Sequence, residues 1–425
     1  METNNPKITE ALIQYIWKLQ YFNKSELETI EGDMLQIIHP GTFNTNQGPD
    51  FSNAKIKVGD TTWAGNIELH IKSSDWQSHK HSGDKNYSNI ILHVVWQHEA
   101  NLLLPFPTLE LQSRVSKVLL AKYTALMNAE SFIPCEEMIR QVDAFIVNTW
   151  KERLLVERLQ QKAQIIFQYL NENNNHWEET FWWLLAKNFG AKVNTDAFEK
   201  IARSITVSVL AKHKNQIHQI EAMLFGQAGL LVNDFIEDYP ALLKKEYKFL
   251  KAKYKLEPIK ELLHFLRMRP SNFPSVRLAQ LSVLIHQSLH LFSAIKESHS
   301  LKEIKKLLDT TANDYWHYHY IFDERSAYKP KKLGEEMVNN ILINTIIPIL
   351  FAYGHLHKEN EYKDRALQWL EEIAAEKNTI TNGYRNIGIG NKNAYDSQSL
   401  IQLKNEYCNK KRCLDCAIGN NIMKS

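Results

Sequence analysis

Three polar side chains on one predicted strand give the first indication of chemistry. Glu68, His70 and Lys72 alternate with apolar residues, and side chains two apart in a strand share a face. Asp50 precedes this strand by about one β-hairpin. Two carboxylates from neighbouring strands can bind Mg²⁺ or Mn²⁺, which polarises a phosphodiester and activates a water. The pattern predicts a hydrolytic site with Asp50 and Glu68 as metal ligands and His70 or Lys72 orienting water or stabilising charge.

The same residues also have a purely structural interpretation. Asp50 follows Pro49 in a turn-rich stretch, and aspartate in a turn commonly bonds to its own backbone. Glu68 and Lys72 would then form salt bridges on an exposed face of the sheet.

A histidine-rich segment follows the predicted strand. His79 and His81 lie two residues apart, Asp84 follows, and His93 lies on the next predicted strand. Such a group can bind zinc or iron, or it can line a substrate groove beside the carboxylates. The alternatives are a solvated loop and, for His93, a core histidine with a satisfied hydrogen bond.

Three of the four cysteines lie close together near the end of the chain. Cys408, Cys413 and Cys416 have the spacing C-x₄-C-x₂-C, with lysine and arginine between them. Neighbouring cations lower thiol pKa values, and clustered cysteines in a reducing compartment favour metal binding over disulfides. A tetrahedral zinc ion or an iron–sulfur cluster needs a fourth ligand, which Cys135 could supply. Reduced thiols on a terminal helix are the alternative.

An arginine-rich turn is a candidate phosphate site. Arg267, Arg269 and Arg277 surround a Pro- and Ser-containing turn that opens a predicted helix. A helix N-terminus with guanidinium groups nearby suits phosphate binding, although core packing and capping also explain these residues.

The elements that position these residues indicate an α+β protein. A first helix is predicted at Ile8–Leu19 from its apolar spacing, and Gly59-Asp60 predicts a hairpin turn. The predicted strands are Ala54–Val58, Thr61–Ala64, Ile67–Ile71 and Ile90–Trp96. These runs predict a small N-terminal α/β domain with a mixed sheet.

From about Val142 the periodicity becomes helical and stays so. We expect three packed parts: an α/β domain at 1–130, a helical domain at 131–300 and a C-terminal helical domain at 301–425 that ends in the cysteine cluster. No long Gly/Ser or Pro linker separates them.

Overall charge does not by itself call for a nucleic-acid partner. The net charge is +3, with 44% hydrophobic and 23% charged residues, so any phosphate-binding surface must come from local clustering. The N-terminus is polar, unlike a signal peptide, and the longest apolar run, Ile341 to Tyr353, is too short to span a bilayer. We expect a cytoplasmic protein without membrane association.

The arrangement around Asp50 and Glu68 resembles the PD-(D/E)XK nuclease superfamily over about residues 10–100. Gly48-Pro49-Asp50 matches its first motif and Glu68-Leu69-His70 its second, with His70 where lysine is expected. Lys72 could supply the missing charge. The resemblance implies a Mg²⁺- or Mn²⁺-dependent nuclease acting on nucleic acid, with DNA favoured over RNA.

Two further resemblances concern the rest of the chain. One upstream and three C-terminal cysteines resemble the iron–sulfur-binding members of that superfamily, such as the nuclease module of bacterial helicase–nucleases and CRISPR-associated adaptation nucleases. The whole chain resembles a family of uncharacterised bacterial proteins, which assigns no activity. The segments that carry this are HPGTFNTNQGPDFSNAKI, GNIELHIKSSDW, LFGQAGLL, RMRPSNFPSVRLAQL, ILINTIIPILFAYG and YCNKKRCLDCAIG.

The sequence therefore favours a divergent metal-dependent nuclease or nucleic-acid-processing protein. The alternatives are a nucleic-acid binder that has lost catalysis, suggested by His70, and a metalloenzyme of another class built on His70, His79, His81 and His93.

Overall fold

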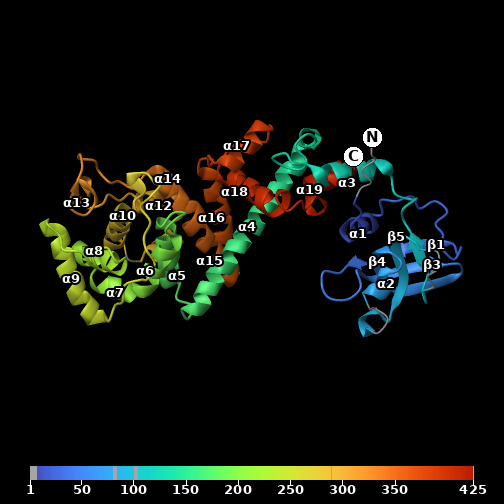
Figure 1. Ribbon diagram of the computed structural model, residues 1–425, viewed down its shortest axis with the longest axis horizontal. Helices are drawn as coiled ribbons and strands as arrows, with labels where there is room; N and C mark the ends of the chain where they lie inside the picture. The colour runs from blue at the N-terminus through green and yellow to red at the C-terminus, as the bar shows by residue number, and fades with distance from the viewer. Residues whose placement is uncertain (1–6, 80–83, 100–103, 289, 425) are drawn as a thin grey trace. The chain divides into compact units, whose positions relative to one another are not determined.

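The computed structural model describes residues 7–79, 84–99, 104–288 and 290–424 (Figure 1). The chain forms two compact units: unit 1 comprises Met1–Trp150 and Leu403–Ser425, and unit 2 comprises Lys151–Gln402. The C-terminal segment with its three cysteines therefore belongs to the same unit as the N-terminal domain. A mixed sheet near the N-terminus precedes a large helical region, which confirms the predicted α+β class.

Unit 1 contains a six-stranded sheet with the order β1-β3-β4-β5-β6, in which β2 also pairs with β3. The pairs up to β3–β4 are antiparallel, whereas β4–β5 and β5–β6 are parallel. The strands are β1 (Leu35–His39), β2 (Thr42–Phe43), β3 (Phe51–Val58), β4 (Thr61–Lys72), β5 (Ile90–Gln97) and β6 (Thr108–Glu110).

The central hairpin has the predicted turn but a longer second strand. Gly59 adopts a positive φ of 55° between β3 and β4, a conformation that glycine tolerates without a steric cost. The two runs predicted at Thr61–Ala64 and Ile67–Ile71 form one continuous strand, β4. The polar residues between the runs do not end it, because both neighbouring strands pair with it there.

Helix α1 (Glu10–Leu19) packs against β4 in unit 1 (Figure 1). Thr9 caps its N-terminus by accepting a hydrogen bond from the Leu12 N–H, and Ile13, Ile16 and Trp17 are fully buried. The other helices of this unit are α2 (Asp75–Ser78), η2 (Lys85–Tyr87), α3 (Lys117–Asn128), η3 (Ile139–Gln141), the first turns of α4 (Ala144–Glu172), η6 (Leu403–Cys408), η7 (Cys413–Asp415) and α19 (Ala417–Lys424).

Unit 2 is helical apart from a small hairpin of β7 (His319–Ile321) and β8 (Glu324–Arg325). One apolar core contains Phe225, Trp316 and Trp369. Beyond α4 its helices are α5 (Trp177–Phe189), α6 (Thr195–Ser204), α7 (Val207–Lys212), α8 (Ile217–Gln227), α9 (Asp238–Tyr254), η4 (Pro270–Asn272), α10 (Pro274–Gln287), α11 (Leu291–Glu297), α12 (Leu301–Leu307), α13 (Asp314–His317), α14 (Glu335–Ile341), η5 (Leu342–Ile346), α15 (Ile347–His357), α16 (Asn360–Glu372), α17 (Thr379–Asn386) and α18 (Ala394–Gln402).

The most apolar part of unit 2 is longer than the sequence run indicated. Among the described residues, the helical run Glu335–His357 has 23 residues and is long and apolar enough to cross a membrane, but 78% of its apolar window is buried within the protein. The helices Pro274–Gln287 and Leu291–Glu297 are bent relative to each other, and together they are long and apolar enough to cross a membrane only if both count as one span. Burial of this extent is the pattern of a core helix.

Candidate active site

A β-bulge decides which residue lies beside Asp50. Near the turn β3 and β4 pair in the register Val58↔Thr61, but the register shifts between Phe51 and Ala54, so that Phe51 lies opposite Ile67. Without that shift Asp50 would lie opposite Leu69. One extra residue in β3 therefore places the Asp50 and Glu68 side chains next to each other.

Backbone and side-chain hydrogen bonds fix the two carboxylates. The Leu69 N–H donates to Asp50 Oδ2 at 3.0 Å, and Gln14 Nε2 of α1 donates to Oδ1 at 2.7 Å. The Asp50 N–H in turn donates to Glu68 Oε2 at 3.1 Å. The Asp50 carboxylate thus accepts hydrogen bonds from β4 and from α1, rather than only from its own turn.

Both carboxyl groups hold their protons more tightly than usual. Burial raises the pKa of Asp50 to about 6, against the lowering effect of its hydrogen bonds from Leu69 and Gln14. Burial, and then the charge of Asp50, raise the pKa of Glu68 to about 8. Two carboxylates this close favour a bound proton or a cation. The cluster therefore has the electrostatic character of a cation site.

Histidines extend the site along β4. His70 is 1% exposed and His93 of β5 is fully buried, and His70 Nδ1 lies 2.8 Å from His93 Nε2. His70 Nε2 lies 3.1 Å from His79 Nδ1 and 3.7 Å from Glu68 Oε1. If His93 accepts the Nδ1 proton of His70, the Nε2 lone pair of His70 is left on the side of His79 and Glu68.

One group in the described part of the chain has a spacing suited to a metal ion. The ligand atoms of Glu10, His70 and His79 all lie within 4.8 Å of one another. Two nitrogen ligands that bind a metal ion at about 2.1 Å, in adjacent positions of an octahedron, lie about 3 Å from each other. His70 Nε2 and His79 Nδ1 have nearly this separation, 3.1 Å. His79 is exposed, so this side of the group is open to solvent.

Aromatic rings form an apolar wall beside the histidines. Trp76 of α2 is buried and has edge contacts with both His70 and His93. Phe106 packs against Trp76 with ring centroids 4.5 Å apart. Such a wall lowers the local dielectric, which strengthens the electrostatic interactions of the cluster.

Other predicted residues of this region have different partners or lie outside the described residues. Lys72 is half exposed, and its Nζ pairs with Glu99 Oε1 at 3.2 Å. Asp84 caps η2 by accepting from the Asn86 N–H. His81 lies outside the described residues. The ammonium predicted to complete the row is thus engaged elsewhere, and His70 is the basic side chain next to Glu68.

Three residues of the cluster were missed by the sequence analysis. Glu10 and Gln14 are four apart on α1 and so share a face. That spacing was a usable signal, although an acidic residue in a first turn also suits the helix dipole. Tyr87 gave no signal. Its ring makes an edge contact with Trp76, with ring centroids 6.0 Å apart, and burial, followed by the charges of Glu68 and Asp50, raises its pKa to about 12.

The predicted phosphate-binding arginines belong to unit 2. Arg277 hydrogen-bonds Gln280 and Asn272, and burial lowers its pKa to about 10. Arg267 and Arg269 are exposed. Local capping and packing engage Arg277, whereas the other two present their charges to solvent.

The four cysteines come together in unit 1. Cys135, Cys408, Cys413 and Cys416 line one pocket, and none forms a disulfide. The sequence predicts that Cys135 joins the three C-terminal cysteines, and the four side chains do lie around one pocket.

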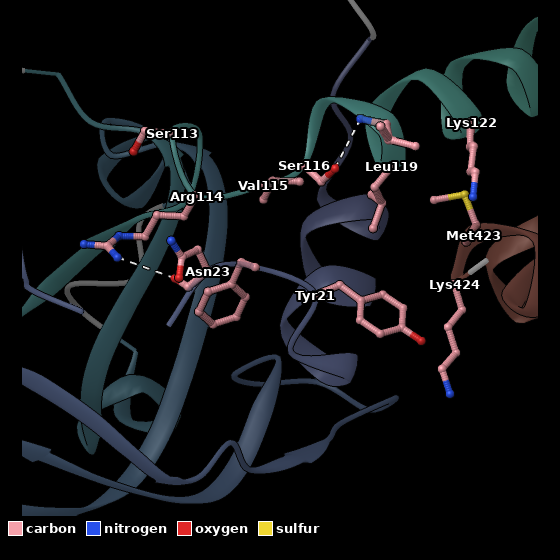
Figure 2. Close-up of a pocket in the computed structure, with 12 residues that line it drawn as sticks. Tyr21, Asn23, Ser113, Arg114, Val115, Ser116, Leu119, Lys122, Met423 and Lys424 are labelled. Carbon is pink, nitrogen blue, oxygen red and sulfur yellow. Dashed lines mark hydrogen bonds between the residues drawn. The ribbon is translucent and has the colours of Figure 1, made fainter. Parts of the chain in front are cut away.

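A larger surface pocket of unit 1, of about 610 Å³, contains none of the predicted site residues. Figure 2 shows Arg114 beside Asn23 in its wall. The Arg114 guanidinium donates to the backbone carbonyls of Ser25 and Glu26 at 3.1 and 3.0 Å. That arginine fixes the loop after α1, so its charge serves the fold.

Comparisons with known proteins place the chain in a family. The family model described as "Protein of unknown function (DUF2851)" matches residues 10–379, and the chain belongs to this family. No curated protein and no solved structure gives a significant match.

Proposed function

We propose that this member of the DUF2851 family is a metal-dependent phosphodiesterase of the nuclease type. The observation that carries the proposal is the convergence of the Asp50 and Glu68 carboxylates at the bulged end of β3, joined by the 3.1 Å hydrogen bond from the Asp50 N–H. Their raised pKa values give the pair a reason to bind a cation.

Each residue of the cluster has a definite task in this proposal. Asp50 and Glu68 bind Mg²⁺ or Mn²⁺ through their oxygens, and Gln14 and Leu69 keep the Asp50 carboxylate in place. The bound cation would polarise the phosphodiester and favour ionisation of a water. His70 Nε2 orients that water and accepts its proton, while His93 fixes the His70 ring through Nδ1.

The proposed substrate is a nucleic acid, with DNA favoured over RNA. Net charge alone does not attract a polyanion to this chain, since it is only +3. Affinity must come from local contacts to phosphates, and it should fall as salt rises. Arg267 and Arg269 are exposed and are candidates for phosphate contacts on unit 2 itself.

A cleavage assay on the full chain tests the proposal. Single-stranded, duplex and branched DNA and RNA would each be incubated with Mg²⁺, with Mn²⁺ and with a chelator. We expect cleavage that requires the added cation. Salt-sensitive binding without cleavage by folded, metal-supplied protein would instead favour a nucleic-acid binder that has lost catalysis.

The group of Glu10, His70 and His79 favours a second candidate, a metalloenzyme of another class with a histidine-bound ion. Imidazole ligands suit zinc, iron and other transition metals better than Mg²⁺. In that case the two histidines are ligands, and His70 is not a base.

Metal titration of His79→Ala separates the two candidates. If His79 is a ligand, its removal should weaken Zn²⁺ or Mn²⁺ binding by at least about 10-fold, the scale of losses in perturbed metal sites. The matched control is Gln77→Ala, an exposed neighbour on α2. Equal affinities in the two variants, measured by calorimetry, would exclude the histidine-bound ion.

A further inference from the structure

Four cysteines from two distant parts of the chain form a second, separate site in unit 1. Cys135 lies between α3 and η3, whereas Cys408, Cys413 and Cys416 lie between the end of η6 and the start of α19. Three are buried and Cys408 is half-buried. The rest of the pocket wall is largely apolar and includes Ile133, Leu403 and Ile418. Four reduced thiols in such surroundings are a donor set for a thiophilic metal.

The spacing of the sulfurs distinguishes between metals. A single zinc ion binds sulfur at about 2.3 Å, so the sulfurs of a tetrahedral site lie about 3.8 Å apart. In the described part of the chain, however, only the ligand atoms of Glu10, His70 and His79 form a group within 4.8 Å of one another. No three of the four cysteine sulfurs therefore lie within 4.8 Å of one another.

The sulfurs nevertheless surround a common space. Cys135, Cys408, Cys413 and Cys416 all line the same pocket. In a [4Fe–4S] cluster with four cysteine ligands each thiolate binds a different iron atom, so its ligands are spaced more widely than those of a single ion. The wide but convergent arrangement fits a cluster.

Hydrogen-bond donors also point at one of these sulfurs. The backbone N–H groups of Gly419 and Ile418 donate hydrogen bonds to the Cys416 sulfur. Gly419 has no room for a side chain, because a Cβ there would lie 2.1 Å from the Cys413 carbonyl oxygen. The glycine thus lets α19 approach the cysteine loop, and N–H donors to sulfur are a usual means of tuning a cluster.

We propose that Cys135, Cys408, Cys413 and Cys416 bind a [4Fe–4S] cluster, which fastens the C-terminal segment of the chain to the rest of unit 1. Binding exchanges thiol protons for iron and needs no change in the oxidation state of the protein. The cluster has a structural task that is independent of the proposed hydrolytic site.

The first experiment is metal analysis of the full chain, produced with iron and purified without oxygen. We expect about four iron atoms and four acid-labile sulfides per folded chain, with visible absorbance that bleaches on reduction. One zinc ion per chain without sulfide would overturn the proposal. So would the absence of iron and sulfide after reconstitution with both.

Variants test whether the cysteines are the ligands and whether the cluster holds the C-terminal segment to the rest of unit 1. Cys408→Ser and Cys135→Ser should each lose the cluster, whereas Ile139→Val, a change in the same pocket wall, and Asp50→Asn should retain it. If the serine variants do not fold, the metal content of the unmodified chain still decides the matter. Limited proteolysis should cleave residues 403–425 faster after the cluster is removed, and equal rates would contradict the fastening role.

Discussion

Glu68→Gln and Asp50→Asn should each lower the rate of metal-dependent cleavage by at least about 10²-fold, the scale seen when one charge-stabilising group is removed from a catalytic site. Both changes keep the shape of the side chain and remove its ability to carry a negative charge. In the Glu68→Gln variant the Asp50 N–H can still donate to the new amide oxygen, as it does to Glu68 Oε2. Loss of activity would therefore report a lost metal ligand and not a lost fold, which circular dichroism would check.

Lys72→Ala is the matched control on the same strand. Its ammonium pairs with Glu99 in a solvent-exposed ion pair, and such surface pairs contribute little to stability. The variant should keep nearly the full cleavage rate, whereas His70→Ala should lose most of it. A large loss in Lys72→Ala with an active His70→Ala would show that Lys72 takes the role proposed here for His70.

The position of Asp50 illustrates how far sequence reasoning reaches. The turn at Gly59-Asp60 and the alternation of β4 predict that Asp50 and Glu68 lie on adjacent strands. Whether they touch depends on the bulge near Asn53, whose φ is +57°. A shift of one residue changes which side chain lies opposite, and asparagine, although it tolerates a positive φ, also occurs in many turns and does not by itself indicate a bulge.

The remaining features of the site depend on long-range packing, which limits how far they can be predicted from the sequence. The apolar stripe of α1 predicts that the helix covers the sheet. It does not predict that Gln14 reaches Asp50 or that Glu10 lies beside His70 and His79, because helix rotation and position depend on the whole interface. The cysteines were easier, since their chemistry requires a fourth ligand and only Cys135 remained. The prediction that Lys72 faces the site was based only on the alternation of side chains along the strand. That alternation does not show that its ammonium pairs with Glu99.

The metal-free protein should be less stable at pH 8 than at pH 5, in contrast to the usual behaviour of paired carboxylates. The pKa of Glu68 is about 8 in the folded state and near 4.3 in an unfolded chain. Between these values the folded state holds a proton that the unfolded state has lost, so the free energy of unfolding falls as pH rises. Asp50 adds a change of the same sign.

The expected loss is on the order of a few kcal/mol across this window, measured by urea unfolding in the presence of a chelator. Glu68→Gln should flatten the profile, whereas Asp60→Asn, in the exposed β3–β4 turn, should leave it unchanged. Saturating Mg²⁺ or Mn²⁺ should stabilise the unmodified protein more at pH 8 than at pH 5, because the cation binds the ionised carboxylates. The contradicting result is a free energy of unfolding that rises with pH equally in the unmodified protein and in both variants. It would mean that the Asp50 and Glu68 carboxyl groups do not raise each other's pKa. The proposed cation site would then lose its electrostatic basis.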